Sequence, residues 1–306
     1  PIGMTTGSFI PDFLLTLISL TFLIYYIKNK LWKYYKNNFF YLLFCFWLIL
    51  VIGSLTSDGY IHEKFNNDYT GNSFLNTLKN SITYLRFIVF SVAVYYLSLN
   101  YSNFYKHTYM SFFIALSIAL FFAYFQLITG HLIFFDNIKD LFSNGFRDPY
   151  ERISGLFGDE LVLGGFLVRT LPLFCAFFFL SNKLDKKKTY NFILLFILTA
   201  VMIFFAGERS ALALLIFFMG LSFILLKEYR AFLFKIGIFF LLLISIATIF
   251  KKDLRERYFV HTFQNGFFIN GKLNLFSEQH QNHYTAAYRI FLDHPIKGSG
   301  VKMFRY

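Results

Sequence analysis

Charged residues are scarce in this sequence. Only 15% of its 306 residues are Asp, Glu, Lys or Arg, whereas a soluble domain carries about 25%. Proline is limited to five residues, 57% of the residues are hydrophobic and the mean hydropathy is +0.53. A water-soluble globule of this length could not cover its surface with so few polar side chains. The composition therefore excludes a soluble globular protein and a disordered chain.

Cysteines are few, and carboxylates deep in the apolar runs are absent. The two cysteines, Cys45 and Cys175, each lie inside an apolar run, where a lone thiol usually serves as a small hydrophobe. They show no zinc-binding or redox spacing, so a disulfide scaffold is excluded. No Asp or Glu lies deep in an apolar run, which argues against a proton-coupled transporter.

Long apolar runs, rich in Phe, Leu and Ile, dominate what is present. A membrane-spanning helix needs about 20 mainly apolar residues. The runs that approach this length are 9–27, 38–55, 80–99, 108–129, 161–180, 191–206, 210–226 and 234–250. The sixth and seventh are short. The sequence predicts an all-α fold, a polytopic transmembrane helical bundle of about eight spans, without strands.

The loops between these runs predict the orientation. Loops 28–37, 100–107, 181–190 and 227–235 carry 12 basic residues, and the longer loops of the other side carry six. Basic residues in short loops stay in the cytoplasm. We therefore place the first set inside and residues 56–79, 130–160 and 251–306 outside. The net charge of +12 is then a topology signal, and no nucleic-acid partner is expected.

Two domains are predicted. Residues 1–250 form the transmembrane domain, whose N-terminal helix we expect to be missing because the chain starts outside. Residues 251–306 begin a large external loop whose C-terminal part we also expect to be missing. Tyr284, Ala287, Tyr288 and Phe291 recur at helical spacing, which predicts a short amphipathic helix in that loop.

Arg169 does not fit a passive membrane helix. It lies about nine residues beyond Asp159–Glu160, which is roughly 13 Å at helical rise and close to the middle of the membrane. Burying an arginine there costs at least about 2.5–3.5 kcal/mol, so a partner or a polar cavity is expected. The alternatives are snorkelling and a structural ion pair. Pro172 permits a kink one turn later.

Arg209 marks a tight turn. The string FFAGERSALALL leaves few polar residues between two apolar runs, which predicts a helical hairpin at the outer face. Ser210 and Glu208 are expected to cap the following helix. A guanidinium beside helix N-terminal amides is suited to a phosphate. The alternative is a surface pair of Arg209 with Glu208.

The external loop adds candidate residues. His280 and His283 are three residues apart, and a neutral histidine there can act as a general base for a hydroxyl; the alternative is that both are solvated. Gly298 and Gly300 permit a tight turn. The His and carboxylate spacing matches no common metal site, so no metal is expected.

Three strings together indicate a family. RISGLFGDELVLGGFLVRTLPL, then AGERSALALL, then FLDHPIKGSGVKMFR resemble, in that order, the O-antigen ligase and polymerase superfamily of polytopic membrane glycosyltransferases. The resemblance covers about residues 150–306. Arg209 stands where the family has Arg-x-x-x-Leu, although Leu212 is three residues on. Gly298 and Gly300 match the Pro-x-x-Gly-x-Gly turn. His280 stands where the family's second arginine is usual.

The resemblance implies an activity at the periplasmic face of the bacterial inner membrane. Family members transfer a glycan from undecaprenyl diphosphate to a sugar hydroxyl, on lipid A-core for a ligase or on another lipid-linked glycan for a polymerase. No cofactor is implied. Arginines hold the diphosphate and a histidine activates the acceptor. Arg209, His280 and His283 become the candidate catalytic residues, and Arg169, Arg289, Gly298 and Gly300 the candidate substrate-binding residues.

Two alternatives stay open. A polymerase would share every feature named above. A transporter would require repeat-related halves and intramembrane ionisable pairs, whereas Arg86 and Arg169 stand isolated in the sequence. We expect a ligase-type glycosyltransferase whose acceptor-activating histidine is His280, His283 or a residue beyond position 306.

Overall fold

The computed structural model describes residues 9–55, 72–130, 152–157, 162–181, 186–250, 255–256, 258, 268–269, 272–273, 278–295 and 298. The chain divides into two compact units. Unit 1 comprises Pro1–Pro11 and Asn103–Lys272, and unit 2 comprises Asp12–Ser102 and Leu273–Tyr306. The predicted domain boundary at residue 250 stays a prediction, because most residues beyond it lie outside the described part of the chain.

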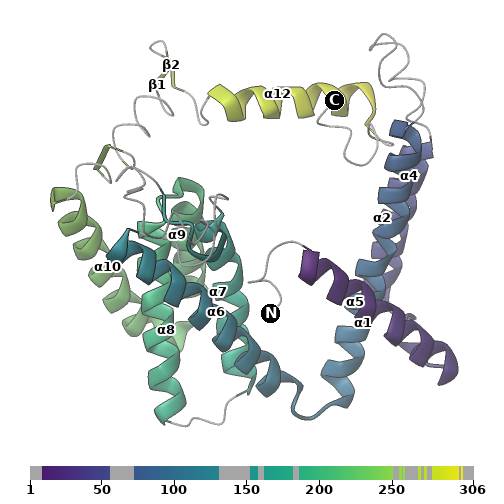
Figure 1. Ribbon diagram of the computed structural model, residues 1–306, viewed down its shortest axis with the longest axis horizontal. Coiled ribbons are helices and arrows are strands. Elements are labelled where there is room, and N and C mark those ends of the chain that lie inside the picture. The colour runs from purple at the N-terminus through teal and green to yellow at the C-terminus, as the bar shows by residue number, and fades with distance from the viewer. Residues whose placement is uncertain are drawn as a thin grey trace, which may run out of the picture. The chain divides into compact units, whose positions relative to one another are not determined.

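Unit 1 is a helical bundle (Figure 1). Its elements are α6 (Phe104–Thr129), η3 (Gly155–Phe157), α7 (Leu163–Ser181), α8 (Lys186–Phe205), α9 (Arg209–Leu225), η4 (Lys227–Tyr229) and α10 (Arg230–Phe250). Helix α7 continues through Pro172. Ala115, Ala119 and Ala123 lie four residues apart on α6 and are buried, because small side chains let neighbouring helices approach closely.

Stacked aromatic rings fill the rest of the unit 1 core. Phe178 of α7 and Phe192 of α8 stack with centroids 3.9 Å apart, and Phe174 stacks on Phe192 at 5.3 Å. Tyr109 of α6 also stacks on Phe174, with centroids 5.3 Å apart. The abundance of Phe therefore serves helix packing as well as the lipid-facing surface.

Unit 2 has shorter helices, and its candidate membrane spans are less buried than α6, α7 and α8 of unit 1. Its elements are α1 (Phe9–Lys28), η2 (Trp32–Tyr34), α2 (Asn38–Leu55), α4 (Asn72–Thr83), α5 (Leu85–Asn100) and α12 (Glu278–Asp293). Its buried cluster combines Phe22 and Tyr26 of α1, Phe40 of α2, and Val92 and Ala93 of α5. A single residue, Tyr84, separates α4 from α5.

Seven helical stretches of the described residues are long and apolar enough to cross a membrane. They are Phe9–Lys28, Asn38–Leu55, Thr77–Asn100, Phe104–Thr129, Leu163–Ser181, Lys188–Phe205 and Lys227–Ile249. Helix α9, the predicted seventh span, has 17 residues and is shorter than the others. The protein is thus a membrane-embedded, multi-pass helical bundle, as the sequence predicts.

The outward-facing side chains agree with this assignment. Ile128 at the end of α6 is 81% exposed and Ile249 in α10 is 72% exposed, and each is one of many exposed large apolar side chains. In water such a continuous apolar surface would drive aggregation, whereas lipid tails solvate it. One pairing of two-residue strands, β1 (Phe268–Ile269) with β2 (Lys272–Leu273), departs from the strand-free prediction. It is too short to change the fold class.

Candidate functional site

The turn between α8 and α9 is a tight hairpin, as predicted. The N–H of Ala206 donates to Met202 at 2.8 Å and that of Gly207 to Phe204 at 3.1 Å, which closes α8. Gly207 has φ +71°, a conformation that glycine adopts without strain. Arg209 is the first residue of α9, and its side chain is exposed. Arg209 therefore stands at a helix N-terminus at the end of unit 1 that the loops predict to face outside.

Glu208 has a different role from the one expected. Its carboxylate forms no cap hydrogen bond with α9. Instead Oε1 accepts the N–H of Gly164 at 2.7 Å and Oε2 accepts that of Gly165 at 2.9 Å. These two N–H groups belong to the first turn of α7, which has no partner for them within the helix. Glu208 therefore caps α7 from a distance of more than 40 residues along the chain.

A glutamine fixes the segment before α7 in a similar way. Gln126 near the end of α6 is buried, and its Oε1 accepts the N–H groups of Ser154 at 3.0 Å and Gly155 at 2.7 Å. Gly155 has φ +57°, and a Cβ there would lie 3.3 Å from the backbone of Ala123. The segment thus rests directly on α6, at a position that only glycine fits.

A third polar side chain closes the same end of unit 1. The hydroxyl of Tyr258 donates to the carbonyl of Phe204 at 2.6 Å, and the two rings stack with centroids 5.1 Å apart. Glu208, Gln126 and Tyr258 each bind backbone groups of a neighbouring element. Sequence reasoning missed all three of these contacts. The signals that were available were a lone amide inside the apolar run 108–129 and the Gly164–Gly165 pair at a helix start.

Arg169 lies on the exposed side of α7. Its neighbours Val168, Thr170 and Leu171 are buried in unit 1, whereas the Arg169 side chain is exposed. Within the described ranges, it makes no hydrogen bond or ion pair. The expected partner is therefore not among the described residues, and the polar cavity and the role of Arg169 in substrate binding stay predictions.

The other candidate residues lie in or beyond α12. The helix begins at Glu278, so it includes both His280 and His283. The side chains of His283 and Arg289 are exposed, while the His280 side chain and Gly300 lie outside the described residues. Gly298 has φ +66° and donates its N–H to His294 at 3.0 Å, which confirms the expected turn. These residues belong to unit 2 and Arg209 to unit 1, so the joint site stays a prediction.

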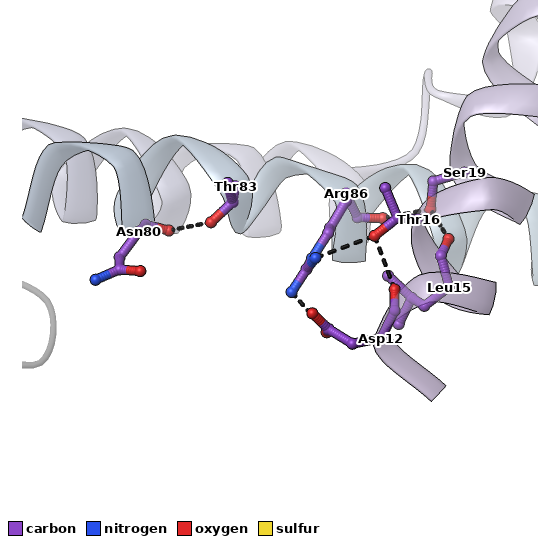
Figure 2. A network of polar contacts seen from close by, with 7 residues as sticks. All are labelled: Asp12, Leu15, Thr16, Ser19, Asn80, Thr83 and Arg86. Atoms are coloured by element: carbon purple, nitrogen blue, oxygen red, sulfur yellow. Dashed lines mark hydrogen bonds and ion pairs between the residues drawn. The ribbon is translucent and has the colours of Figure 1, made fainter. Parts of the chain in front are cut away.

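Arg86 is paired, contrary to the sequence interpretation that it stands isolated. Its Nη2 donates to Asp12 Oδ1 at 2.6 Å and its Nη1 donates to Thr16 Oγ1 at 3.0 Å; both contacts are drawn in Figure 2. The hydroxyl of Ser19 donates to the carbonyl of Arg86 at 2.9 Å. Arg86 lies nine residues after Thr77 and fourteen before Asn100, close to the middle of its span. The network neutralises a charge that would otherwise be costly at that depth.

The network includes a carboxylate at the start of the first apolar run. Asp12 lies in the first turn of α1, inside the first apolar run, and its side chain is 52% exposed. The described residues contain no group of three His, Cys, Asp or Glu that could hold a metal ion.

Comparisons with known proteins add no identification. No family model, no curated protein and no solved structure matches this chain.

Proposed function

We propose that this protein is a membrane glycosyltransferase of the O-antigen ligase type, which transfers a glycan from undecaprenyl diphosphate to a sugar hydroxyl of lipid A-core. The transfer takes place at the periplasmic face of the bacterial inner membrane. Besides the resemblance of three sequence strings, one structural observation carries the proposal. Arg209, with an exposed side chain, opens α9 on a turn that Glu208 joins to the start of α7.

The chemistry explains why such an arginine is needed. The acceptor oxygen attacks the anomeric carbon, and the bond from that carbon to the diphosphate oxygen breaks. The electron pair leaves with the diphosphate, and the hydroxyl proton passes to a base, for which His280 and His283 are the candidates. Negative charge grows on the diphosphate as the bond breaks, so a guanidinium fixed beside it lowers the barrier. The N-terminus of α9 contributes its positive end to the same place.

The fixed turn matters because a charge stabilises a transition state most when it is already held in position. A guanidinium that must first be ordered gives back part of its stabilisation as lost conformational entropy. The Glu208 carboxylate holds the backbone beside Arg209 through two hydrogen bonds to α7. Arg169, Arg289, Gly298 and Gly300 would contribute to the binding of the donor and acceptor.

The experiment is glycan transfer from a lipid-diphosphate donor in a strain that lacks its own ligase, with variants expressed at matched levels. Arg209→Ala should lower the rate by about 10²–10³, the usual effect of removing one fixed donor. Arg209→Lys should retain part of the activity, because it keeps the charge and loses only the two-pronged geometry.

Arg230 supplies a matched control. It is also the first residue of a helix, α10, but its guanidinium binds the carbonyls of Phe223 and Ile224 at the end of α9. Arg230→Ala should therefore lower thermal stability without a specific loss of transfer. Near-normal activity of both Arg209 variants, or an equal loss in Arg230→Ala, would contradict a direct role of Arg209. Arg169→Leu should abolish transfer while the protein still inserts.

Two alternative functions, an O-antigen polymerase and a transporter, can be distinguished by what the protein makes or moves. Extension of lipid-linked glycan without lipid A-core would identify an O-antigen polymerase. The Asp12–Arg86 ion pair joins two candidate spans, and a transporter would use such a pair if it lay inside the membrane. Movement of a solute into vesicles, lost in Asp12→Asn while the Arg209 variants keep it, would favour that function.

A further inference from the structure

The loop between α1 and α2 carries a concentrated positive charge, and its lysines form no ion pair with another described residue. Lys28, Lys30, Lys33 and Lys36 fall within nine residues, and all four side chains are exposed. The sequence holds no Asp or Glu from position 13 to 57 or from 72 to 102. Those stretches form most of unit 2. They therefore supply no carboxylate that could balance the charge of the lysines.

A topology signal alone would not require this loop to be ordered. Yet backbone hydrogen bonds run through it: Leu31 donates to Tyr26 at 3.2 Å, Lys36 to Lys33 at 3.3 Å and Asn37 to Tyr35 at 2.8 Å. Lys30 has φ +50°, the one positive value outside glycine in the described part of the chain. A left-handed lysine is uncommon and persists when the surroundings hold it. The lysines are therefore presented from a defined backbone.

Aromatic rings form the floor of this loop. Tyr26 contacts Trp32 edge to face at 4.9 Å and Tyr35 at 4.6 Å. Tyr34 contacts Tyr96 of α5 at 5.0 Å, and its hydroxyl donates to Asn100 at 3.2 Å. The Trp32 side chain itself is 54% exposed. An exposed tryptophan beside lysines at the end of a membrane span is typical of the headgroup region.

Two hydroxyls under the loop have no hydrogen-bond partner in the part of the chain that the structure describes. The Oη atoms of Tyr26 and Tyr35 are both buried and make no hydrogen bond among the described residues, although buried polar atoms are nearly always paired. Burial raises the pKa of Tyr35 to about 12, with a contribution from Tyr26, so its hydroxyl stays a donor at any physiological pH. Because both atoms are buried, each would reach a phosphate oxygen only through a bridging water.

We propose that the α1–α2 loop is a binding site for the headgroup of an anionic phospholipid in the leaflet that this loop faces. The four lysines supply the charge, and Trp32 lies at the boundary of headgroups and acyl chains. Charge complementarity selects an anionic over a zwitterionic lipid, and each engaged lysine is worth about fivefold in preference. This site is independent of the glycosyltransferase assignment, since it involves none of its residues.

Trp32 provides the reporter for the test. The chain has two tryptophans, so Trp47→Phe leaves Trp32 as the sole one. This variant is reconstituted in phosphatidylcholine vesicles that contain a small fraction of either brominated phosphatidylglycerol or brominated phosphatidylcholine. Bromine quenches indole fluorescence only at contact. At equal mole fraction, the brominated phosphatidylglycerol should show an occupancy at least about fivefold higher. Equal quenching by the two lipids would overturn the proposal.

Two matched double variants distinguish a local binding site from an effect of the protein's net charge. In the single-tryptophan protein, Lys30→Gln with Lys33→Gln should remove most of the preference. Lys227→Gln with Lys235→Gln removes the same charge from η4 and the start of α10. This second double variant should keep the lipid preference. An equal loss in both would mean that only net charge matters, and the site would be refuted. Lys28 and Lys36 remain in place to preserve the orientation, which accessibility of an added cysteine verifies.

A soluble competitor separates a lipid from a free phosphate. Excess glycerol phosphate should leave the quenching unchanged, because it lacks the acyl chains that hold a lipid beside Trp32. Full relief of quenching by this competitor would identify a site for soluble phosphate and overturn the lipid assignment.

Discussion

The carboxylate of Glu208 accepts the backbone N–H of Gly164 at 2.7 Å, and this contact ties the α8–α9 turn to the first turn of α7. The approach is so close that a Cβ on Gly164 would lie 3.0 Å from Glu208 Cδ and 3.2 Å from Ala211 Cβ. The contact therefore requires a glycine at position 164. The position of Arg209, which follows Glu208, depends on this glycine and on the Glu208 contact.

Replacement of Gly164 by alanine should lower the free energy of unfolding by about 1–3 kcal/mol, because the added methyl must displace the Glu208 carboxylate. Gly165→Ala is the control, since its Cβ would meet Glu208 Oε2 at an ordinary 3.4 Å. That variant should be neutral or gain up to about 1 kcal/mol from reduced backbone entropy. Thermal unfolding of the two purified variants in detergent measures the difference. Equal melting temperatures would show that the cap is dispensable.

Gln126→Leu should destabilise unit 1 by about 1–3 kcal/mol for each of the two buried N–H groups that it leaves without an acceptor. Thr199→Val is a suitable comparison. Its hydroxyl is buried but donates only to Leu195 in its own helix, so its removal strands no donor. Thermal unfolding should separate the two variants clearly; a similar effect of both would indicate that Gln126 contributes only volume.

The Asp12–Arg86 pair should behave as a coupled unit. Asp12→Asn leaves a guanidinium near the middle of a span without its counter-charge and should lower stability. Arg86→Gln should do so too, whereas the double variant should lose less than the sum of the two. A double-mutant cycle on thermal unfolding should give a coupling of about 1 kcal/mol or more. Strict additivity would place the pair among the ion pairs that contribute nothing.

The predicted orientation can be checked by cysteine labelling from the outer face. The background needs Cys45→Ser and Cys175→Ala, because Cys45 is exposed. A cysteine at Asn144 should react with an impermeant reagent, and one at Lys187 should react only after the membrane is opened, as the positive-inside bias predicts. The opposite pattern would reverse the orientation and move Arg209 to the cytoplasmic face.

The spans were predictable because their determinants are local. A helix in lipid must satisfy its backbone hydrogen bonds internally, and its length is fixed by the bilayer, so composition alone identifies it. The run 38–55 coincides with α2, and the run 9–27 differs from α1 by one residue. The α8–α9 turn and helix α12 were predictable for similar reasons, the first from a break in hydropathy and the second from a helical repeat.

Partner choice was decided by the tertiary structure alone. Glu208 lies 44 residues from Gly164, Gln126 lies 28 from Ser154, and Arg86 lies 74 from Asp12. No spacing rule links such residues, because which helix faces which is set by packing over the whole unit. Sequence determined that these polar side chains need partners, since unpaired groups in a membrane are costly. Only the packed helices determined which backbone groups and charges supply them.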